Sequence, residues 1–390
     1  MPNYSGKWNL QGQLAGIKAG TWTGIGGSEL YIWGDGANGR LGDGTVVFYS
    51  SPIQISSTGG TTFSTLGLGG ASTKALKSDG TLWAWGNNDE GALGDGTVIH
   101  RSSPVQISSD TDWEYLGIGG GHNLVIKTDG SLWSFGAAYF GGLGNRGHSQ
   151  HNSSPTQVGA DTDWAYVSGG GSYSLSVKTD GTFWSWGYNN FGQLGQNLSG
   201  AVNRSSPVQV GALTNWYVVE AGNTTGYAIK TDGTLWSWGD ATYGGLGNNS
   251  ASPAHKSSPI QIGALTNWSA IKGGANRALA LKTDGTIWTW GRNQVGQLGI
   301  DNVIDKSSPV QIGALTNWTA VASGQNSQYA LKSDGTLWAW GYNLDGQLGL
   351  GDKVSYSSPV QVGTSTGWTS IDINQNGTHA AGILLERTGM

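Results

Sequence analysis

The hydrophobic positions of this chain fall in short runs separated by Gly, Pro, Asn and Asp. Segments such as "TLWSW" (234–238) and "SPVQVG" (206–211) are rich in aromatic and β-branched residues. That composition is typical of β-strands. No segment keeps an apolar period of 3.6 residues, so the pattern predicts an all-β fold.

The same pattern recurs seven times. A Trp-Gly pair, or Phe-Gly once, recurs every 50 to 52 residues, with its glycine at Gly34, Gly86, Gly136, Gly187, Gly239, Gly291 and Gly341. The triplet Ser-Ser-Pro recurs in phase with it. Repeats of 40 to 50 residues built from short strands are typical of β-propellers.

Each unit contains four strand-like pieces. A strand beginning with Trp is followed by an apolar strand ending in Lys, a Thr-Asp-Gly or Ser-Asp-Gly turn, the L-W-x-W-G strand, a variable loop and the S-S-P-V-Q-V strand. The sequence therefore predicts one domain over 1–390, a seven-bladed β-propeller of four-stranded antiparallel blades.

Both ends of the chain carry spare blade sequence. "LAGIKAG" (14–20) and "WTSIDINQNGTHAAGI" (368–383) both match the innermost strand of the unit. A propeller must join its last blade to its first, because otherwise sheet edges stay open. We expect the terminal segments 1–29 and 364–390 to close the ring, and the sequence leaves open which end supplies the closing strand.

Eighteen of the twenty tryptophans occupy three repeated positions. Six begin the innermost strand, and the other twelve fill the two tryptophan positions of L-W-x-W-G. Large aromatics bury much apolar area, so we interpret them as packing between blades. The six Lys-x-Asp-Gly segments are interpreted as turn chemistry.

Composition excludes several functions. The net charge is −5, which gives no electrostatic reason to expect nucleic acid or an anionic membrane as partner. There is no cysteine, hence no disulfide or thiol chemistry. We find no signal peptide and no run that could span a bilayer, which leaves the location open: cytoplasmic, or part of a released viral particle.

No catalytic motif is present, so the sequence predicts a non-enzymatic protein without a cofactor. His148 and His151 share one loop, and "NNDEGALGDG" (87–96) and "DGANGRLGDG" (35–44) faintly resemble calcium loops. Neither pattern has the full ligand spacing of a metal site, and none is predicted.

The most variable segment of the unit precedes Ser-Ser-Pro. Binding residues concentrate in loops that vary over a repeated scaffold. The residue just before each triplet is basic in four units and tyrosine in two. These candidate binding residues, expected on one face of the ring, are Tyr49, Arg101, Asn152, Arg204, Lys256, Lys306 and Tyr356. Arg and Tyr are favoured in recognition surfaces, although solvated loop tips would have the same pattern.

The pattern L-W-x-W-G-x-N-x-x-G-Q-L-G, followed by Pro-Val-Gln-Val, resembles the repeats of the regulator of chromosome condensation (RCC1) family. The resemblance implies a seven-bladed propeller, and for the family's chromosomal member an exchange factor for a small GTPase. No basic N-terminal tail and no nucleotide-expelling insertion are found here.

We therefore predict a non-enzymatic binding or structural scaffold that recognises a protein or a glycan, or assembles with itself, through the loops of one face. A virus or phage particle component, such as a decoration or receptor-binding protein, is one version of this prediction. The alternative is an exchange factor or regulator of a small GTPase.

Overall fold

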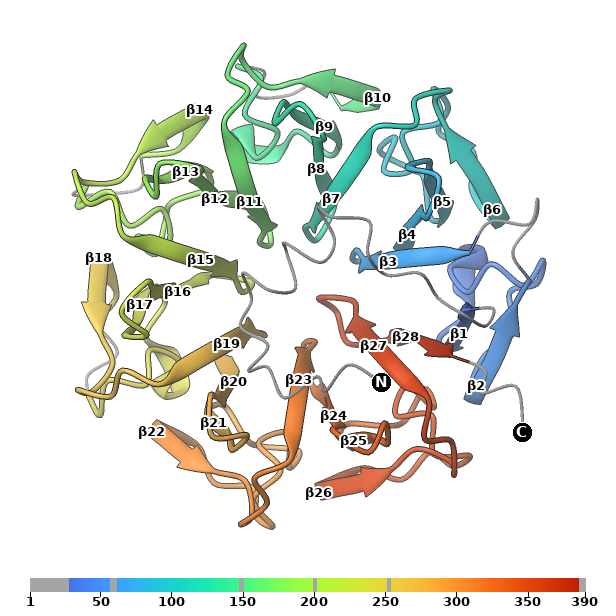
Figure 1. Cartoon of the computed structure of the whole chain (residues 1–390), viewed down its shortest axis with the longest axis vertical. Helices are drawn as coiled ribbons and strands as arrows, with labels where there is room; N and C mark the ends of the chain where they lie inside the picture. The colour runs from blue at the N-terminus through green and yellow to red at the C-terminus, as the bar shows by residue number, and fades with distance from the viewer. Residues whose placement is uncertain (1–27, 57–61, 147–150, 199–201, 251–253, 386–390) are drawn as a thin grey trace, which may run out of the picture.

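A computed structural model describes residues 28–56, 62–146, 151–198, 202–250 and 254–385, and these form a ring of seven four-stranded sheets (Figure 1). All pairings within the sheets are antiparallel, for example β3 with β4 and β4 with β5. The predicted all-β, seven-bladed propeller of four-stranded antiparallel blades is confirmed. No helix among the described residues is long and apolar enough to cross a membrane.

The blades are numbered from the one that combines both ends of the described chain. Blade 1 contains β27 (Trp368–Ile373), β28 (His379–Leu385), β1 (Ser28–Gly34) and β2 (Tyr49–Ile55). Blade 2 contains β3 (Phe63–Leu68), β4 (Ser72–Lys77), β5 (Leu82–Gly86) and β6 (Arg101–Ile107). Blade 3 contains β7 (Trp113–Ile118), β8 (His122–Lys127), β9 (Leu132–Gly136) and β10 (Asn152–Gln157).

The other blades follow in the same order. Blade 4 contains β11 (Trp164–Gly169), β12 (Tyr173–Lys178), β13 (Phe183–Gly187) and β14 (Arg204–Gln209). Blade 5 contains β15 (Trp216–Ala221), β16 (Thr225–Lys230), β17 (Leu235–Gly239) and β18 (Lys256–Gln261). Blade 6 contains β19 (Trp268–Gly273), β20 (Arg277–Lys282), β21 (Ile287–Gly291) and β22 (Lys306–Gln311). Blade 7 contains β23 (Trp318–Ser323), β24 (Ser327–Lys332), β25 (Leu337–Gly341) and β26 (Tyr356–Gln361).

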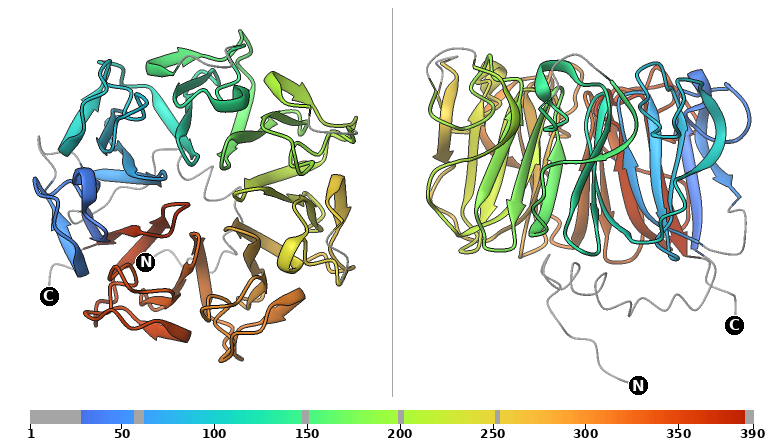
Figure 2. Two further views of the ribbon diagram at one scale, coloured as in Figure 1. Left: turned by 180° about the vertical axis from the view of Figure 1, so that it is seen from behind. Right: turned by 90° about the horizontal axis from the view of Figure 1, so that it is seen from above.

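The strands run between two faces of the ring (Figure 2). In blade 3, His122 at the start of β8 pairs with Gly136 at the end of β9, and Gly136 pairs with Asn152 at the start of β10. The turn between the first two strands and the loop between the last two therefore share one face, here named the loop face. The Asp-Gly turns and the linkers between blades lie on the opposite face, here named the turn face.

The ring is closed by strands from both ends of the described chain. The C-terminal strands β27 and β28 form the inner half of blade 1, and β28 pairs with β1 over Ser28–Gly34. This explains why the first sequence unit lacks the Asp-Gly turn: the two strands that this turn joins in other blades come here from opposite ends. The "LAGIKAG" segment (14–20) lies outside the described residues.

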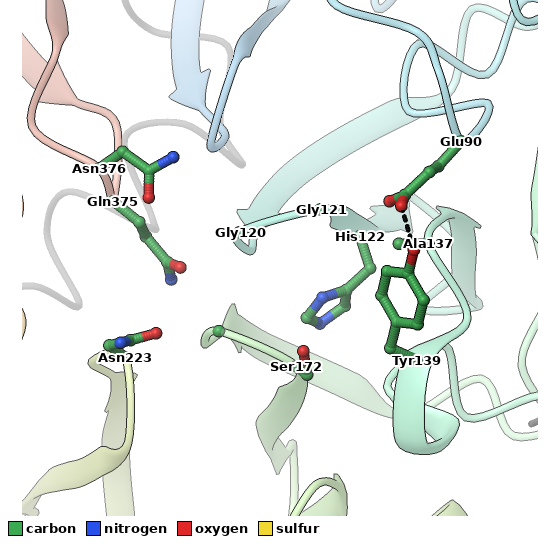
Figure 3. A pocket seen from close by; sticks show the side chains of 11 residues that line it. Glu90, Gly120, Gly121, His122, Ala137, Tyr139, Ser172, Asn223, Gln375 and Asn376 are labelled. Atoms are coloured by element: carbon green, nitrogen blue, oxygen red, sulfur yellow. Dashed lines mark hydrogen bonds between the residues drawn. The ribbon is translucent and has the colours of Figure 1, made fainter.

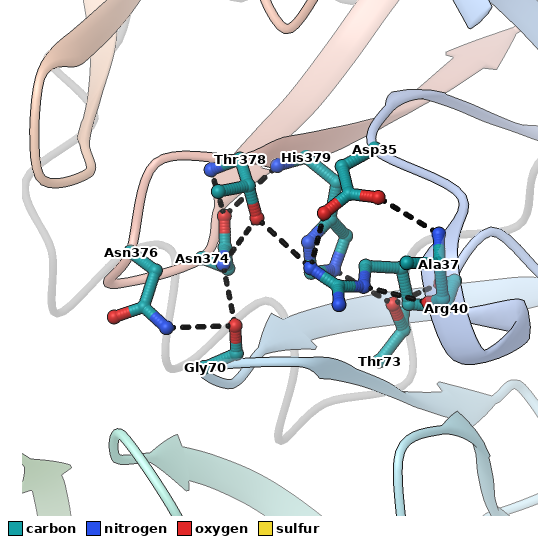
Figure 4. Close-up of polar contacts among 9 residues, drawn as sticks. All are labelled: Asp35, Ala37, Arg40, Gly70, Thr73, Asn374, Asn376, Thr378 and His379. Atoms are coloured by element: carbon teal, nitrogen blue, oxygen red, sulfur yellow. Dashed lines mark hydrogen bonds and ion pairs between the residues drawn. The ribbon is translucent and has the colours of Figure 1, made fainter. Parts of the chain in front are cut away.

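Polar contacts fix blade 1 against blade 2 (Figure 4). Asn374 donates from Nδ2 to the carbonyl oxygen of Gly70 at 2.9 Å, and its Oδ1 accepts from the backbone N–H of His379 at 3.0 Å. His379 Nε2 lies 3.2 Å from Thr73 Oγ1. Arg40 pairs with Asp35 at 2.7 Å beside them. Closure thus rests on side-chain bonds as well as on the β28–β1 ladder.

Two of the three tryptophan positions form the core. The residue before each glycine is completely buried, and the residue that begins each innermost strand is 3–6% exposed where it is Trp. In blade 4, Trp186 donates from Nε1 to the Gly142 carbonyl at 2.8 Å and its ring meets Trp164 edge-on. The packing interpretation is confirmed for the twelve tryptophans at these two positions.

The third tryptophan position, the first tryptophan of L-W-x-W-G, has a different role. Its tryptophans are half-buried, and each lies against the lysine that precedes the Asp-Gly turn. Lys282 Nζ is 3.7 Å from the ring centre of Trp288 and 4.7 Å from that of Trp268, and six blades repeat this arrangement. The lysines are therefore held between aromatic rings by cation–π attraction in addition to lying next to a turn.

Candidate functional site

One pocket breaks the sevenfold repeat. A cavity of about 300 Å³ opens on the loop face where the turns of several blades meet at the central channel (Figure 3). Five blades line it, and their side chains include Gln375 and Asn376 of blade 1, Glu90 of blade 2, His122 and Tyr139 of blade 3, Ser172 of blade 4 and Asn223 of blade 5. The positions of these residues recur in the blades, but their side chains differ from blade to blade, so this mixture of groups occurs at one place on the face.

The turn of blade 1 reaches furthest into the channel mouth. It has five residues (374–378) between β27 and β28, whereas three separate the first two strands of every other blade. Gln375 in this longer turn donates from Nε2 to the carbonyl oxygen of Gly169 in blade 4, on the other side of the channel. Asn376 donates to Gly70 at 3.0 Å. The extra length therefore supplies one wall of the pocket.

Backbone bonds link the glycine turns of blades 2, 3 and 4 beside the pocket. Gly70 N–H donates to Gly120 O, and Gly120 N–H to Gly170 O, both at 3.0 Å. A Cβ atom on Gly70 would lie 2.2 Å from Gly120 O, closer than any real contact. Glycine is required there because successive turns touch through their backbones. The turns of these three blades are thus linked to one another through their backbones.

His122 and Glu90 supply the titratable groups of the pocket. His122 is 2% exposed, and its Nε2 lies 2.9 Å from Ser174 Oγ. Burial lowers the pKa of His122 to about 4, so its imidazole is neutral at pH 7. Glu90 accepts a hydrogen bond from the Tyr139 hydroxyl (Figure 3). The pocket consequently carries one negative charge and no positive one from the described residues that line it.

The loops after the Trp-Gly pair fall into two classes. In four blades an asparagine two residues after the glycine folds the loop, as when Asn293 Oδ1 accepts from Leu298 N–H at 2.8 Å. In blades 1, 3 and 5 that residue is Gly or Ala, and a 3-10 turn forms instead, with a non-glycine residue at positive φ. Those residues are Asn38, Phe140 and Tyr243.

Phe140 and Tyr243 are unusual because bulky residues rarely adopt positive φ. Both have φ of 55°, and both side chains remain 44–46% exposed. Holding a non-glycine residue in this region costs about 1 kcal/mol or more. Aromatic side chains are thus presented on the loop face at a cost in backbone strain.

A charged layer lies directly below the pocket turns along the innermost strands. Lys272 Nζ is 3.4 Å from both carboxylate oxygens of Glu220, which also accepts from Tyr166 at 3.5 Å. Burial would lower the pKa of Lys272, but Glu220, Tyr115 and Asp372 raise it above its ordinary value. Burial raises the pKa of Asp372 to about 6. Lys272, Glu220 and Tyr166 thus join the innermost strands of blades 6, 5 and 4, and Asp372 of blade 1 accepts from the Leu68 N–H of blade 2 at 2.9 Å.

The residues predicted from the variable loops lie elsewhere. Each is the first residue of the outermost strand of its blade, half-buried, and pairs with the glycine of Trp-Gly in the same register. We call these seven residues the rim residues: Tyr49, Arg101, Asn152, Arg204, Lys256, Lys306 and Tyr356. They occupy equivalent places around the circumference, so the fold does not bring them together, and none lines the pocket.

Local contacts engage several rim residues. Arg101 pairs with Asp95 at 2.8 Å, and the Tyr356 hydroxyl donates to Asp352 at 2.8 Å. In the loop 87–96, which faintly resembles a calcium loop, Asp95 accepts from Arg101 and from the Thr97 hydroxyl. Within the described ranges, no group of three or more His, Cys, Asp or Glu residues could hold a metal ion. His151 stacks edge-on against Tyr139 at 5.2 Å, and His148 lies outside the described residues.

The fold and this site define the class of protein: a seven-bladed propeller with an asymmetric pocket on one face. The model of the RCC1-like domain matches residues 29–381, so this chain belongs to the RCC1-like family.

Among its relatives, the chain is 29% identical over 286 residues (70% of the chain) to human E3 ubiquitin-protein ligase HERC2 and 28% identical over 289 residues (72%) to the ultraviolet-B receptor UVR8 of Arabidopsis thaliana. The matched stretches are 6% of the ligase and 64% of the receptor, so the chain spans less than two thirds of either relative.

Solved structures show the same fold. Human WBSCR16 matches with a TM-score of 0.82 at 20% identity, over 92% of this chain and 99% of that one. Prp20p of Saccharomyces cerevisiae, reported with its binding properties to Gsp1p and histones, matches with a TM-score of 0.81 at 19% identity, over 93% of each chain. None of these comparisons supports the prediction of a virus or phage particle component.

Proposed function

We propose that this chain is a non-catalytic, protein-binding propeller that engages its partner through the loop face. The carrying observation is a pattern of exposed apolar residues beside the rim. In five blades a β-branched residue two positions before the rim residue is 41–63% exposed; these are Val47, Ile99, Val202, Ile304 and Val354.

Exposed apolar side chains next to Arg, Lys or Tyr make a surface suited to protein recognition. Scattered apolar residues on a surface are ordinary, but their recurrence at one place in five blades offers a partner the same kind of contact in each of those blades. The pocket opens on the same face, so a partner seated there can contact both. Membership in a family with protein-binding relatives supports the proposal.

The test uses one variant on each face. Arg204→Glu with Lys256→Glu changes the rim, and Leu213→Ser with Leu265→Ser changes exposed linker residues on the turn face. Proteins captured by the wild-type chain from its native source should be lost with the rim variant and kept with the turn-face variant. Equal capture by both variants would mean that the rim residues are solvated and do not contact the partner.

The alternative proposal is regulation of a small GTPase as an exchange factor. Its support is family membership together with the fold shared with Prp20p. The measurement is the release rate of a fluorescent guanine nucleotide from a small GTPase of the same source. A rate that the purified chain leaves unchanged contradicts this alternative and leaves the binding proposal intact.

A further inference from the structure

An aromatic strip leads outward from the pocket along the loop face. It consists of Tyr139, Phe140, Tyr188 and Phe191. Tyr139 lines the pocket, the rings of Phe140 and Tyr188 lie 4.6 Å apart, and those of Tyr188 and Phe191 lie 6.3 Å apart. The strip therefore connects blade 3 to blade 4, with Tyr139 and Phe140 nearly half exposed.

Phe140 in this strip has a strained backbone. A residue kept at φ of 55° with its side chain 46% exposed gains little burial in return for the strain. Asn38, at the equivalent place in blade 1, has the same conformation with a residue type that tolerates it. Strained residues persist where the surroundings or function require them, which favours a contact role for the Phe140 ring.

The pocket end of the strip is selective by charge. Glu90 accepts from Tyr139 through Oε1, whereas its Oε2 has no hydrogen-bond partner within the described part of the chain. No Lys or Arg is among the described pocket residues. A carboxylate beside an exposed aromatic ring attracts a cation through both an ion pair and the ring face, and it repels an anionic ligand.

We propose that the pocket takes an arginine side chain of a protein partner, whose neighbouring apolar residues lie along the aromatic strip. This inference rests on the proposed protein-binding function and deepens it. The guanidinium is planar and has five donors, of which one or two suit Glu90 Oε2 while the others face the polar lining of the pocket, where Asn223 and Asn376 lie on the wall opposite Glu90 (Figure 3). About 300 Å³ is at the small end of ligand sites, as expected for one side chain rather than a large ligand.

A neutral oligosaccharide is the competing occupant, because sugars also stack on aromatic rings and bond to amides. The charge distinguishes the two. A sugar hydroxyl bonds almost equally well to an amide as to a carboxylate, whereas a guanidinium gains a charge-assisted bond only from the carboxylate. Neutralising Glu90 should therefore remove the preference for arginine over an uncharged side chain of the same shape and leave sugar binding nearly unchanged.

The experiment titrates the full-length, isotope-labelled chain with a capped peptide of one arginine between glycines. The matched peptide contains citrulline, which has the same shape without the charge. Backbone amide signals of Gly120, Gly121 and Gly171 report on the pocket. We expect saturable shifts and at least about tenfold tighter binding of the arginine peptide, equivalent to about 1.4 kcal/mol.

Two variants complete the design. Glu90→Gln keeps the size and an acceptor for Tyr139, and it should reduce the preference for arginine to less than about twofold. Asp345→Asn is the control, because Asp345 is a carboxylate at the equivalent loop place in blade 7 and does not line the pocket. It should keep the full preference.

Equal affinity for the two peptides, or no saturable shift up to about 10 mM, overturns the inference. Shifts of the same amides with maltotriose but not with the arginine peptide also overturn it, in favour of a sugar. If capture of partners still depends on the rim while the peptides fail, only this inference is lost and the proposed function stands.

Discussion

Replacing Lys74 should stabilise the protein. Lys74 in β4 is 1% exposed, its Nζ donates to the Ser72 hydroxyl, and no carboxylate pairs with it among the described residues. Burial lowers its pKa from 10.5 to about 7. The equivalent residues of blades 3 and 4, Leu124 and Leu175, are completely buried leucines. Lys74→Leu therefore introduces the residue type that two other blades already bury at this place.

The magnitude follows from the pKa. A lowering from 10.5 to about 7 means that burial disfavours the charged lysine by about 5 kcal/mol, of which about 4 remains at pH 7 because half of the folded molecules are neutral there. Loss of the bond leaves the Ser72 hydroxyl unpaired, at a cost of about 1–2 kcal/mol. We expect a net gain of about 2–3 kcal/mol in the free energy of unfolding at pH 7.

The pH dependence gives a second readout. Because burial lowers the folded pKa of Lys74, the side chain costs no stability above pH 10.5, where it is neutral in both states, and the cost grows as the pH falls toward 7. The advantage of Lys74→Leu should thus be largest at pH 7 and shrink toward pH 10. Urea unfolding monitored by tryptophan fluorescence at several pH values measures it. A variant less stable than wild type at pH 7, or a difference independent of pH, would refute the reasoning.

Four further predictions use the same unfolding assay. Lys178→Met should destabilise the protein by about 1–3 kcal/mol and Lys282→Met by about 0–1 kcal/mol, because both lysines lie between tryptophans but, of the two, only Lys178 also pairs with two aspartates. Equal losses of stability in the two variants, or a difference between them that 1 M NaCl does not reduce, would contradict this prediction. Wild type should lose up to about 3 kcal/mol through His122 as the pH falls from 6.5 to 4, since burial lowers its folded pKa to about 4, and His122→Gln should lack that part of the decline. Phe140→Asn should leave stability unchanged or raise it by about 1 kcal/mol while weakening partner capture; a large loss of stability would assign Phe140 to packing. Removing 364–390 deletes β27 and β28, so a sharp unfolding transition in the shortened chain would contradict their role in closing blade 1.

The repeat made the architecture predictable from the sequence. Strand count, blade count and the buried tryptophans depend on local patterns that occur in every unit, as at Trp186 and Trp238. The role of the half-buried tryptophans was harder to predict. At Trp288, for example, only the fold shows that Lys282 lies over the ring.

The pocket could not be predicted in the same way. It combines residues from five blades, and their proximity follows from ring closure rather than from spacing along the chain. Two signals were nonetheless present in the sequence: the turn "NQNGT" (374–378) is longer than its counterparts, and only "AYF" (138–140) has two consecutive aromatics at its place in the unit. The partner contacts of rim residues such as Arg204 and Lys256 remain a prediction.

The pairing of β28 with β1 has a consequence for how the ring could be rebuilt. Ser28 lies opposite Leu385, so the two strand ends meet as the ends of a hairpin do. A short linker with the Asp-Gly turn found in other blades, such as 78–81, would join them covalently. The chain could then be opened at another blade's turn, giving a circular permutant with the same ring and a relocated seam. Comparing the stabilities of such permutants would show how far closure depends on where the polypeptide is interrupted.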